Sequence, residues 1–132
     1  NTQILDSSFG KIVPDLVPLA VVALADKSED IKMASHALLC KLCDLVPDTL
    51  VANSTPILES LDKTVNKKIK ESVKAGSSES DRAYDLIRSG LKAALALAAL
   101  PNAREARIFV ENSQKKSKLA AEISRLQKGN AH

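Results

Sequence analysis

Apolar side chains recur every three or four residues along most of this chain, a spacing that predicts amphipathic α-helices. The first complete helix is predicted to begin at Pro14, because the N–H that proline lacks would be unpaired in a first turn. It is expected to end near Asp26. Its apolar stripe consists of Val13, Val17, Val21 and Leu24.

A second helix is predicted over residues 28–45. Ser28 is a suitable N-cap, and the two acidic residues after it favour the positive end of the helix dipole. Pro47 follows the end of this helix, and residues 48–53 are compatible with one short helical turn. The side expected to be buried carries Ile31, Leu38, Leu42 and Leu45.

The apolar spacing in the rest of the sequence predicts further helices. A helix over about 55–69 carries apolar residues at helical spacing, and the polar segment 72–80 is typical of a flexible linker. A long helix over about 80–100 contains LKAALALAAL, whose small residues predict close packing, and we expect it to be the most buried helix. Shorter helices are predicted over residues 103–112 and 117–128, and residues 2–7 are compatible with the end of an earlier helix.

The same helix–turn–helix plan occurs twice. Pro14 corresponds to Pro56 at an offset of 42 residues, and Ile31 corresponds to Ile87 at an offset of 56, so the second unit carries an insertion at about 72–85. Paired helices with a period of about 40 residues are typical of HEAT repeats. We therefore predict an all-α, HEAT/armadillo-like solenoid in one segment, 1–132. Its parts are 1–11 (end of a preceding repeat), 12–46 (repeat), 47–100 (repeat with the insertion) and 102–128 (terminal cap helices).

Composition supports helices over strands. The chain has no Trp, one Tyr and two Phe, and a core of Leu, Val, Ile and Ala suits closely packed helices better than a β-sandwich.

No stretch reaches the about 18 apolar residues of a membrane span. The start carries neither Met nor a signal-peptide pattern, so we interpret the chain as an excerpt of something longer. Two cysteines are too few for a disulfide framework, which favours a reducing compartment.

Charge is unevenly distributed. Residues 1–62 carry four lysines against nine acidic residues, whereas residues 63–74 carry five lysines and one glutamate. Residues 104–132 are again basic, with seven basic and three acidic residues. The segment KTVNKKIKESVK is interpreted either as a solvated helix end or as a docking surface for an acidic partner. No aromatic residue is interleaved for base stacking, so we expect no direct nucleic-acid binding.

Few residues suggest chemistry. Cys40 and Cys43 form a C-x-x-C pair, and His36 precedes Cys40 by one helical turn. Because the pair lies in the middle of a predicted helix, we interpret the cysteines as core residues. Zinc binding or thiol chemistry is the alternative. Asp26, Lys32 and Arg88 are expected to bond between repeats and brace the turns. The sequence has no Gly-rich phosphate loop, no Ser-His-Asp order and no convincing carboxylate pair, so we expect no enzyme and no cofactor.

Four strings then stand out: DIKMASHALLCKLCDLVPDTL, ILESLDKTVNKKIK, DLIRSGLKAALALAALPNA and SKLAAEISRLQK. Their order over about residues 2–128 resembles the extreme C-terminus of the cullin-associated, neddylation-dissociated (CAND) factors, also described as TATA-binding-protein interactors. The match at 72–85 is weak, and the β-hairpin that the family carries just upstream has no counterpart here.

The resemblance implies a ring-like solenoid that wraps an unmodified cullin together with its RING subunit, in the cytoplasm and nucleus. The C-terminal part would clasp the cullin where substrate adaptors dock, so that ubiquitin ligases exchange their receptors. TATA-binding protein is a further possible partner; a membrane is not expected. A transport or scaffold HEAT protein that binds peptides or proteins is the alternative.

For the partner-binding residues we predict a basic set beside the 72–85 insertion, with Tyr84 as the best single anchor. The set consists of Lys67, Lys68, Lys70, Lys74, Arg82 and Tyr84.

Overall fold

The computed structural model describes residues 15–76 and 83–130, which contain seven helices and no strand. A helix over residues 15–24 is followed by α2 (Glu29–Leu45), α3 (Pro47–Ala52), α4 (Ser54–Ala75), α5 (Ala83–Ala98), α6 (Arg104–Gln114) and α7 (Ser117–Asn130). The all-α prediction is therefore confirmed. The predictions for residues 2–7, for Pro14 and for residues 77–82 lie outside the described residues.

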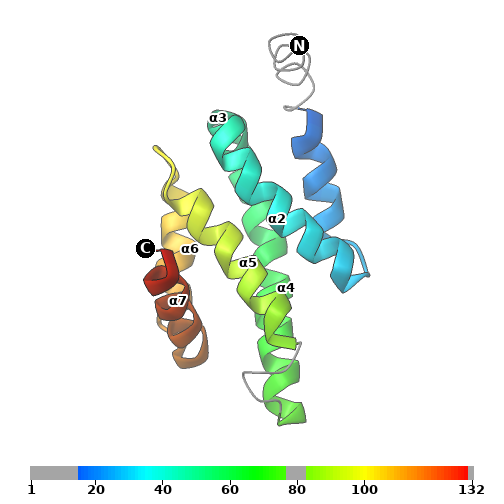
Figure 1. Ribbon diagram of the computed structural model, residues 1–132, viewed down its shortest axis with the longest axis vertical. Helices are drawn as coiled ribbons and strands as arrows, with labels where there is room; N and C mark the ends of the chain where they lie inside the picture. Colours follow the sequence, from blue (N-terminus) through cyan, green and yellow to red (C-terminus); the bar gives the residue numbers. More distant parts are fainter. Residues whose placement is uncertain (1–14, 77–82, 131–132) are drawn as a thin grey trace.

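The helices form two layers (Figure 1). One layer contains α2, α5 and α7, with α5 in contact with both of the others. The other contains the helix of residues 15–24, α4 and α6, with α4 in contact with α6. Each helix pair thus packs against the next, which is the arrangement of a HEAT-like α-solenoid.

The turn between the first two helices is held by its own side chains. Asp26 Oδ1 accepts a hydrogen bond from Ser28 N at 2.8 Å. Ser28 Oγ in turn accepts from Ile31 N at 3.3 Å, which confirms Ser28 as the N-cap of α2. The charged residues between the two apolar stretches therefore form the turn that joins two antiparallel helices.

Helix α5 lies at the centre and is the most buried of the described helices, as its small residues predict. It contacts α2, α3, α4, α6 and α7, and its inner face is almost fully buried. A Cβ at Gly90 would lie 3.0 Å from Val65 Cγ2 and 3.5 Å from His36 Cε1. The missing side chain therefore lets α5 approach both α4 and α2 closely.

The predicted inner face of α2 is wrong at its ends. Ile31 and Leu45 are 44% and 51% exposed, whereas the buried residues of this helix are Ser35, His36, Leu39, Leu42 and Cys43. The two polar residues face inward because each has a specific partner there. Ser35 Oγ donates to Ala20 O at 2.8 Å, and His36 Nδ1 lies 2.7 Å from Ser89 Oγ.

Helix α4 is longer than predicted. We expected an end near residue 69 and a linker from residue 72, but α4 continues to Ala75 and Ser72 is buried. Gly76 then ends the helix in the left-handed region, with φ 67°. Mostly polar residues follow Ile69, so the apolar spacing used for the prediction stops about one and a half turns before the helix ends.

The remaining bounds agree closely with prediction. The short turn near residues 48–53 is α3, and α6 and α7 each extend two residues beyond their predicted ends. Helix α5 ends at Ala98, shortly before Pro101. None of the described helices combines the length and apolar composition that a bilayer-spanning segment needs.

Candidate protein-binding surfaces

Four lysines lie along one face of α4. They recur at positions i, i+4, i+7 and i+11, and all are exposed: Lys63, Lys67, Lys70 and Lys74. We call this set the basic stripe. At its start, Lys63 and Lys67 line a shallow cavity together with Lys32 of α2, so positive charge continues from one helix to the next.

An apolar groove of about 410 Å³ lies beside the stripe. Its lining combines three ammonium groups with apolar side chains, one of which, Val73, is 51% exposed. The lining residues are Lys67, Ile69, Lys70, Glu71, Val73 and Lys74. Such a surface is complementary to an acidic protein surface that also presents apolar side chains.

The structure places the predicted basic contact residues in different environments. Lys67, Lys70 and Lys74 belong to the basic stripe, whereas the Lys68 side chain is only 17% exposed. Lys68 Nζ lies 2.5 Å from Glu29 Oε2 and 3.8 Å from Glu71 Oε2, so this lysine joins α4 to the first turn of α2. Arg82 lies outside the described residues.

Tyr84 has a different environment from the one we expected. The sequence suggests an aromatic anchor beside a loop, but Tyr84 is 2% exposed. It belongs to a second core cluster with Val65, Ile87, Leu91, Leu119 and Ile123. The Arg88 guanidinium lies 5.6 Å from its ring centroid. Its ring therefore packs in the core, and we do not retain it as a contact residue.

Sequence reasoning missed a buried carboxylate at Glu122 of α7. Arg88 Nε lies 2.8 Å from Glu122 Oε2, and Arg125 Nη1 lies 3.2 Å from Glu122 Oε1. Arg88 thus bonds to the following helix pair, as expected of a bracing residue, while Asp26 is bonded within its own turn. The available signal was the position of Glu122 on the apolar stripe of Leu119, Ile123 and Leu126.

His36 is buried between α2, α4 and α5. The Ser89 hydroxyl lies within hydrogen-bond distance of both His36 Nδ1, at 2.7 Å, and Leu86 O, at 3.1 Å. His36 Nε2 has no hydrogen-bond partner among the described residues. Burial, assisted by the nearby Lys32 charge, lowers the pKa of His36 to about 4, so the imidazole is neutral near pH 7.

Cys40 and Cys43 lie in α2, like His36, and their environment makes both thiols unreactive. Cys43 is buried and Cys40 is half-buried, which confirms the interpretation of Cys43 as a core residue. Burial raises the pKa of both thiols, that of Cys43 to about 12. Such thiols are poor nucleophiles. Within residues 15–76 and 83–130, no three His, Cys, Asp or Glu side chains are grouped in a way that could hold a metal ion.

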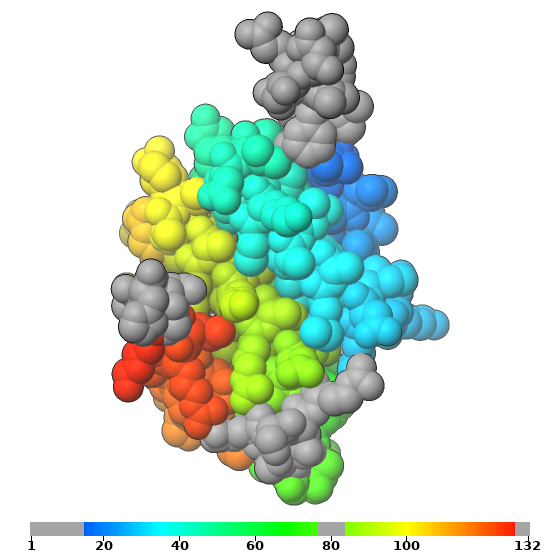
Figure 2. All heavy atoms as spheres, in the orientation of Figure 1, coloured from blue at the N-terminus to red at the C-terminus, as the bar shows by residue number. Residues whose placement is uncertain are grey.

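The helix of residues 15–24 lies along one edge of the molecule (Figure 2), and its exposed apolar side chains, with those of α2, form what we call the end face. Leu19 and Val22 are 64% and 72% exposed, and Ile31 and Leu45 of α2 are also exposed. In the second repeat the counterparts of Leu19, Val22 and Ile31 are buried: Leu61, Thr64 and Ile87. Leu61 lies in the main core together with Val17 and Leu24 of the first repeat. The end face therefore has the composition of a surface on which helix pairs stack.

Stacked helix pairs with one apolar end face define this chain as a HEAT-like α-solenoid segment. The family model described as "TATA-binding protein interacting (TIP20)" matches residues 2–124, and the chain belongs to this family. The resemblance noted from the four sequence strings is thereby confirmed.

Two curated relatives carry the name "Cullin-associated NEDD8-dissociated protein 1". The protein from Dictyostelium discoideum is 30% identical over 127 residues, which cover 92% of this chain and 10% of the relative. The protein from Arabidopsis thaliana is 35% identical over 92 residues, which cover 68% of this chain and 7% of the relative. The chain thus spans about a tenth or less of these relatives. No solved structure gave a significant match.

Proposed function

We propose that this chain is a non-catalytic, cullin-binding segment of a HEAT solenoid, and that the basic stripe of α4 contacts an acidic surface of the cullin. The observation that carries the proposal is the row of exposed lysines beside an apolar groove. The printed names of both relatives describe cullin-associated proteins, which supports this choice of partner.

The finer mechanism follows from the resemblance to the CAND factors. The segment would clasp an unmodified cullin, bound to its RING subunit, near the adaptor site. It would thereby compete with adaptor–receptor modules and promote receptor exchange in cullin–RING ubiquitin ligases, in the cytoplasm and nucleus. The end face would pack against a further helix pair of the same solenoid, and TATA-binding protein is a second partner to be tested.

The first experiment is calorimetry of the chain with an unmodified cullin N-terminal domain, with and without the adaptor as competitor. We expect binding that the adaptor weakens. The triple variant Lys67→Glu/Lys70→Glu/Lys74→Glu should weaken binding by about tenfold or more, since each reversal turns an attraction into a repulsion.

The matched control is Lys115→Glu/Lys118→Glu/Lys128→Glu, which changes the net charge equally at exposed positions away from the stripe. Equal loss of affinity in both triple variants would contradict a specific site on α4. If the longer protein that contains this segment does not bind cullin either, the cullin assignment fails. Capture of linear acidic peptides would then favour the transport or scaffold alternative.

A further inference from the structure

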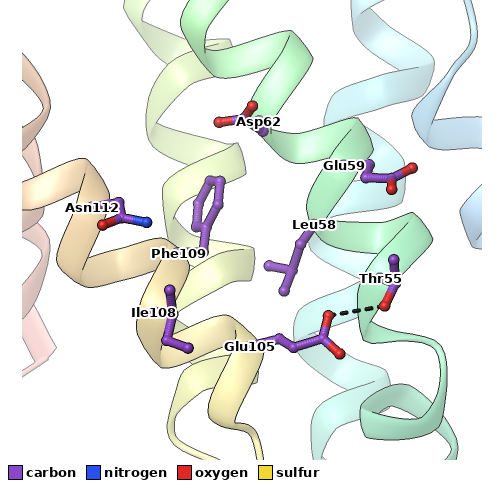
Figure 3. Close-up of a pocket in the computed structure, with 8 residues that line it drawn as sticks. All are labelled: Thr55, Leu58, Glu59, Asp62, Glu105, Ile108, Phe109 and Asn112. Carbon is purple, nitrogen blue, oxygen red and sulfur yellow. Dashed lines mark hydrogen bonds between the residues drawn. The ribbon is translucent and has the colours of Figure 1, made fainter.

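A second groove, of opposite charge, lies between α4 and α6 (Figure 3). It has a volume of about 320 Å³. Each helix contributes four residues at positions i, i+3, i+4 and i+7, so the two helices present matching faces. The lining residues are Thr55, Leu58, Glu59 and Asp62 from α4 and Glu105, Ile108, Phe109 and Asn112 from α6.

Side-chain bonds hold the groove at both ends. At one end Thr55 Oγ1 donates to Glu105 Oε2 at 2.9 Å, directly from α4 to α6. At the other, Asn66 Nδ2 donates to Asp62 Oδ1 at 2.6 Å, and Asn66 Oδ1 accepts from Lys116 Nζ, in the turn between α6 and α7. Hydrogen bonds thus connect α4 to α6 at one end of the groove and to the turn after α6 at the other. Because these bonds are present without a partner, the width of the groove is preorganised for binding.

The floor between these ties is apolar. Leu58 is buried, Phe109 is half-buried against the main core, and Ile108 is 45% exposed. Figure 3 shows all three side chains between the helices, with Phe109 at the centre. An exposed isoleucine beside a ring that the core supports offers a rigid apolar contact at low entropic cost.

The rim is negatively charged. The side chains of Glu59, Asp62 and Glu105 line the groove, and within residues 15–76 and 83–130 no lysine or arginine does. Among the residues that the structure describes, none of these three carboxylates takes part in an ion pair. The sign of charge changes between Asp62 and Lys63, so the groove and the basic stripe suit partners of opposite charge.

We propose that this groove binds a short helical segment of a partner protein that presents apolar side chains along one stripe and lysine or arginine beside them. The apolar stripe would lie on Ile108 and Phe109, and the cations would meet Glu59 and Asp62. An amphipathic helix of about two to four turns matches the length of the two quartets. This inference is independent of cullin binding, because it uses a different part of α4.

The test uses the full 132-residue chain and a fluorescent, amidated helical peptide of about 14 residues, with leucines along one stripe and lysines elsewhere. Amide chemical-shift mapping should place the peptide on the facing sides of α4 and α6. Ile108→Ser should weaken binding about tenfold, and Glu59→Lys by a similar factor. Both positions are exposed, so both variants should keep the helical signal of the parent chain.

The controls are Leu19→Ser, which removes an exposed apolar side chain on the end face, and Asp44→Lys, which reverses an exposed carboxylate on α2. Both should bind the peptide as the parent chain does. The proposal is overturned if Asp44→Lys weakens binding as much as Glu59→Lys. It is equally overturned if a peptide without leucines binds as well, or if a second copy of the chain occupies the groove and excludes the peptide.

Discussion

At the scale of single residues, His36 is the side chain whose chemistry the fold changes most. Its ring is 1% exposed, and its pKa is lowered from 6.5 to about 4. Above pH 6.5 the imidazole is neutral in both the folded and unfolded chains, so it contributes no pH dependence. Below pH 6.5 the unfolded chain binds a proton that the folded chain excludes, so the free energy of unfolding falls.

This difference predicts acid sensitivity between about pH 6.5 and pH 4, with a total loss on the order of 3 kcal/mol. Urea unfolding should be measured across that window in a His132→Gln background, which leaves His36 as the sole histidine. The variant His36→Gln should lose less stability on acidification, because Gln does not titrate. Parallel pH profiles for the two proteins would show that carboxylates alone cause the acid sensitivity.

At the scale of elements, the docking of α7 on α5 depends on a buried charge. The Glu122 side chain is 2% exposed, and its main partner Arg88 is 31% exposed. Removing Arg88 takes away the closer cation from a buried carboxylate and leaves the more exposed Arg125 beside it. Removing the charge of Glu122 leaves an arginine that water can reach, so the two substitutions are not equivalent.

We therefore expect Arg88→Met to destabilise the chain by about 3 kcal/mol, and Glu122→Gln by about 1 kcal/mol. Hydrogen exchange should show that the amides of α7 lose protection first in Arg88→Met. The double variant Arg88→Met/Glu122→Leu should recover much of the loss, because no buried charge remains. The model of the pair is wrong if the double variant is less stable than Arg88→Met.

At the scale of the whole molecule, the end face carries the two most exposed large apolar side chains among the described residues. Leu19 and Val22 are 64% and 72% exposed on one helix, and their counterparts in the second repeat are buried. Among residues 15–76 and 83–130, no helix covers this face. Exposed apolar patches of this kind promote association.

We expect the isolated chain to self-associate at high concentration, and Leu19→Lys/Val22→Lys to reduce this without lowering the midpoint of thermal unfolding. Sedimentation velocity across a concentration series measures the change. Val73→Lys/Ile108→Lys adds the same charge at exposed apolar positions elsewhere and serves as the control. If that control suppresses association equally, net charge rather than the end face is responsible.

The sequence alone determined the helices, the N-cap at Ser28, the repeat and the family, because each of these depends on local spacing or on an ordered set of strings. Periodicity finds an amphipathic helix wherever apolar residues recur on one side. The small residues of α5 also predicted that it would be the most buried helix. The basic stripe was partly predicted, since three of its four lysines were among the proposed contacts.

Only the tertiary structure decided which surfaces meet. The buried side of α2 includes Ser35 and His36, whose hydrogen-bond partners Ala20 and Ser89 lie on other helices. Tyr84 is buried because Val65, Leu119 and Ile123 converge on it from α4 and α7. The α4–α6 groove likewise requires residues 50 positions apart, such as Thr55 and Glu105. Contacts between distant segments leave no local period, so the folded chain alone defines them.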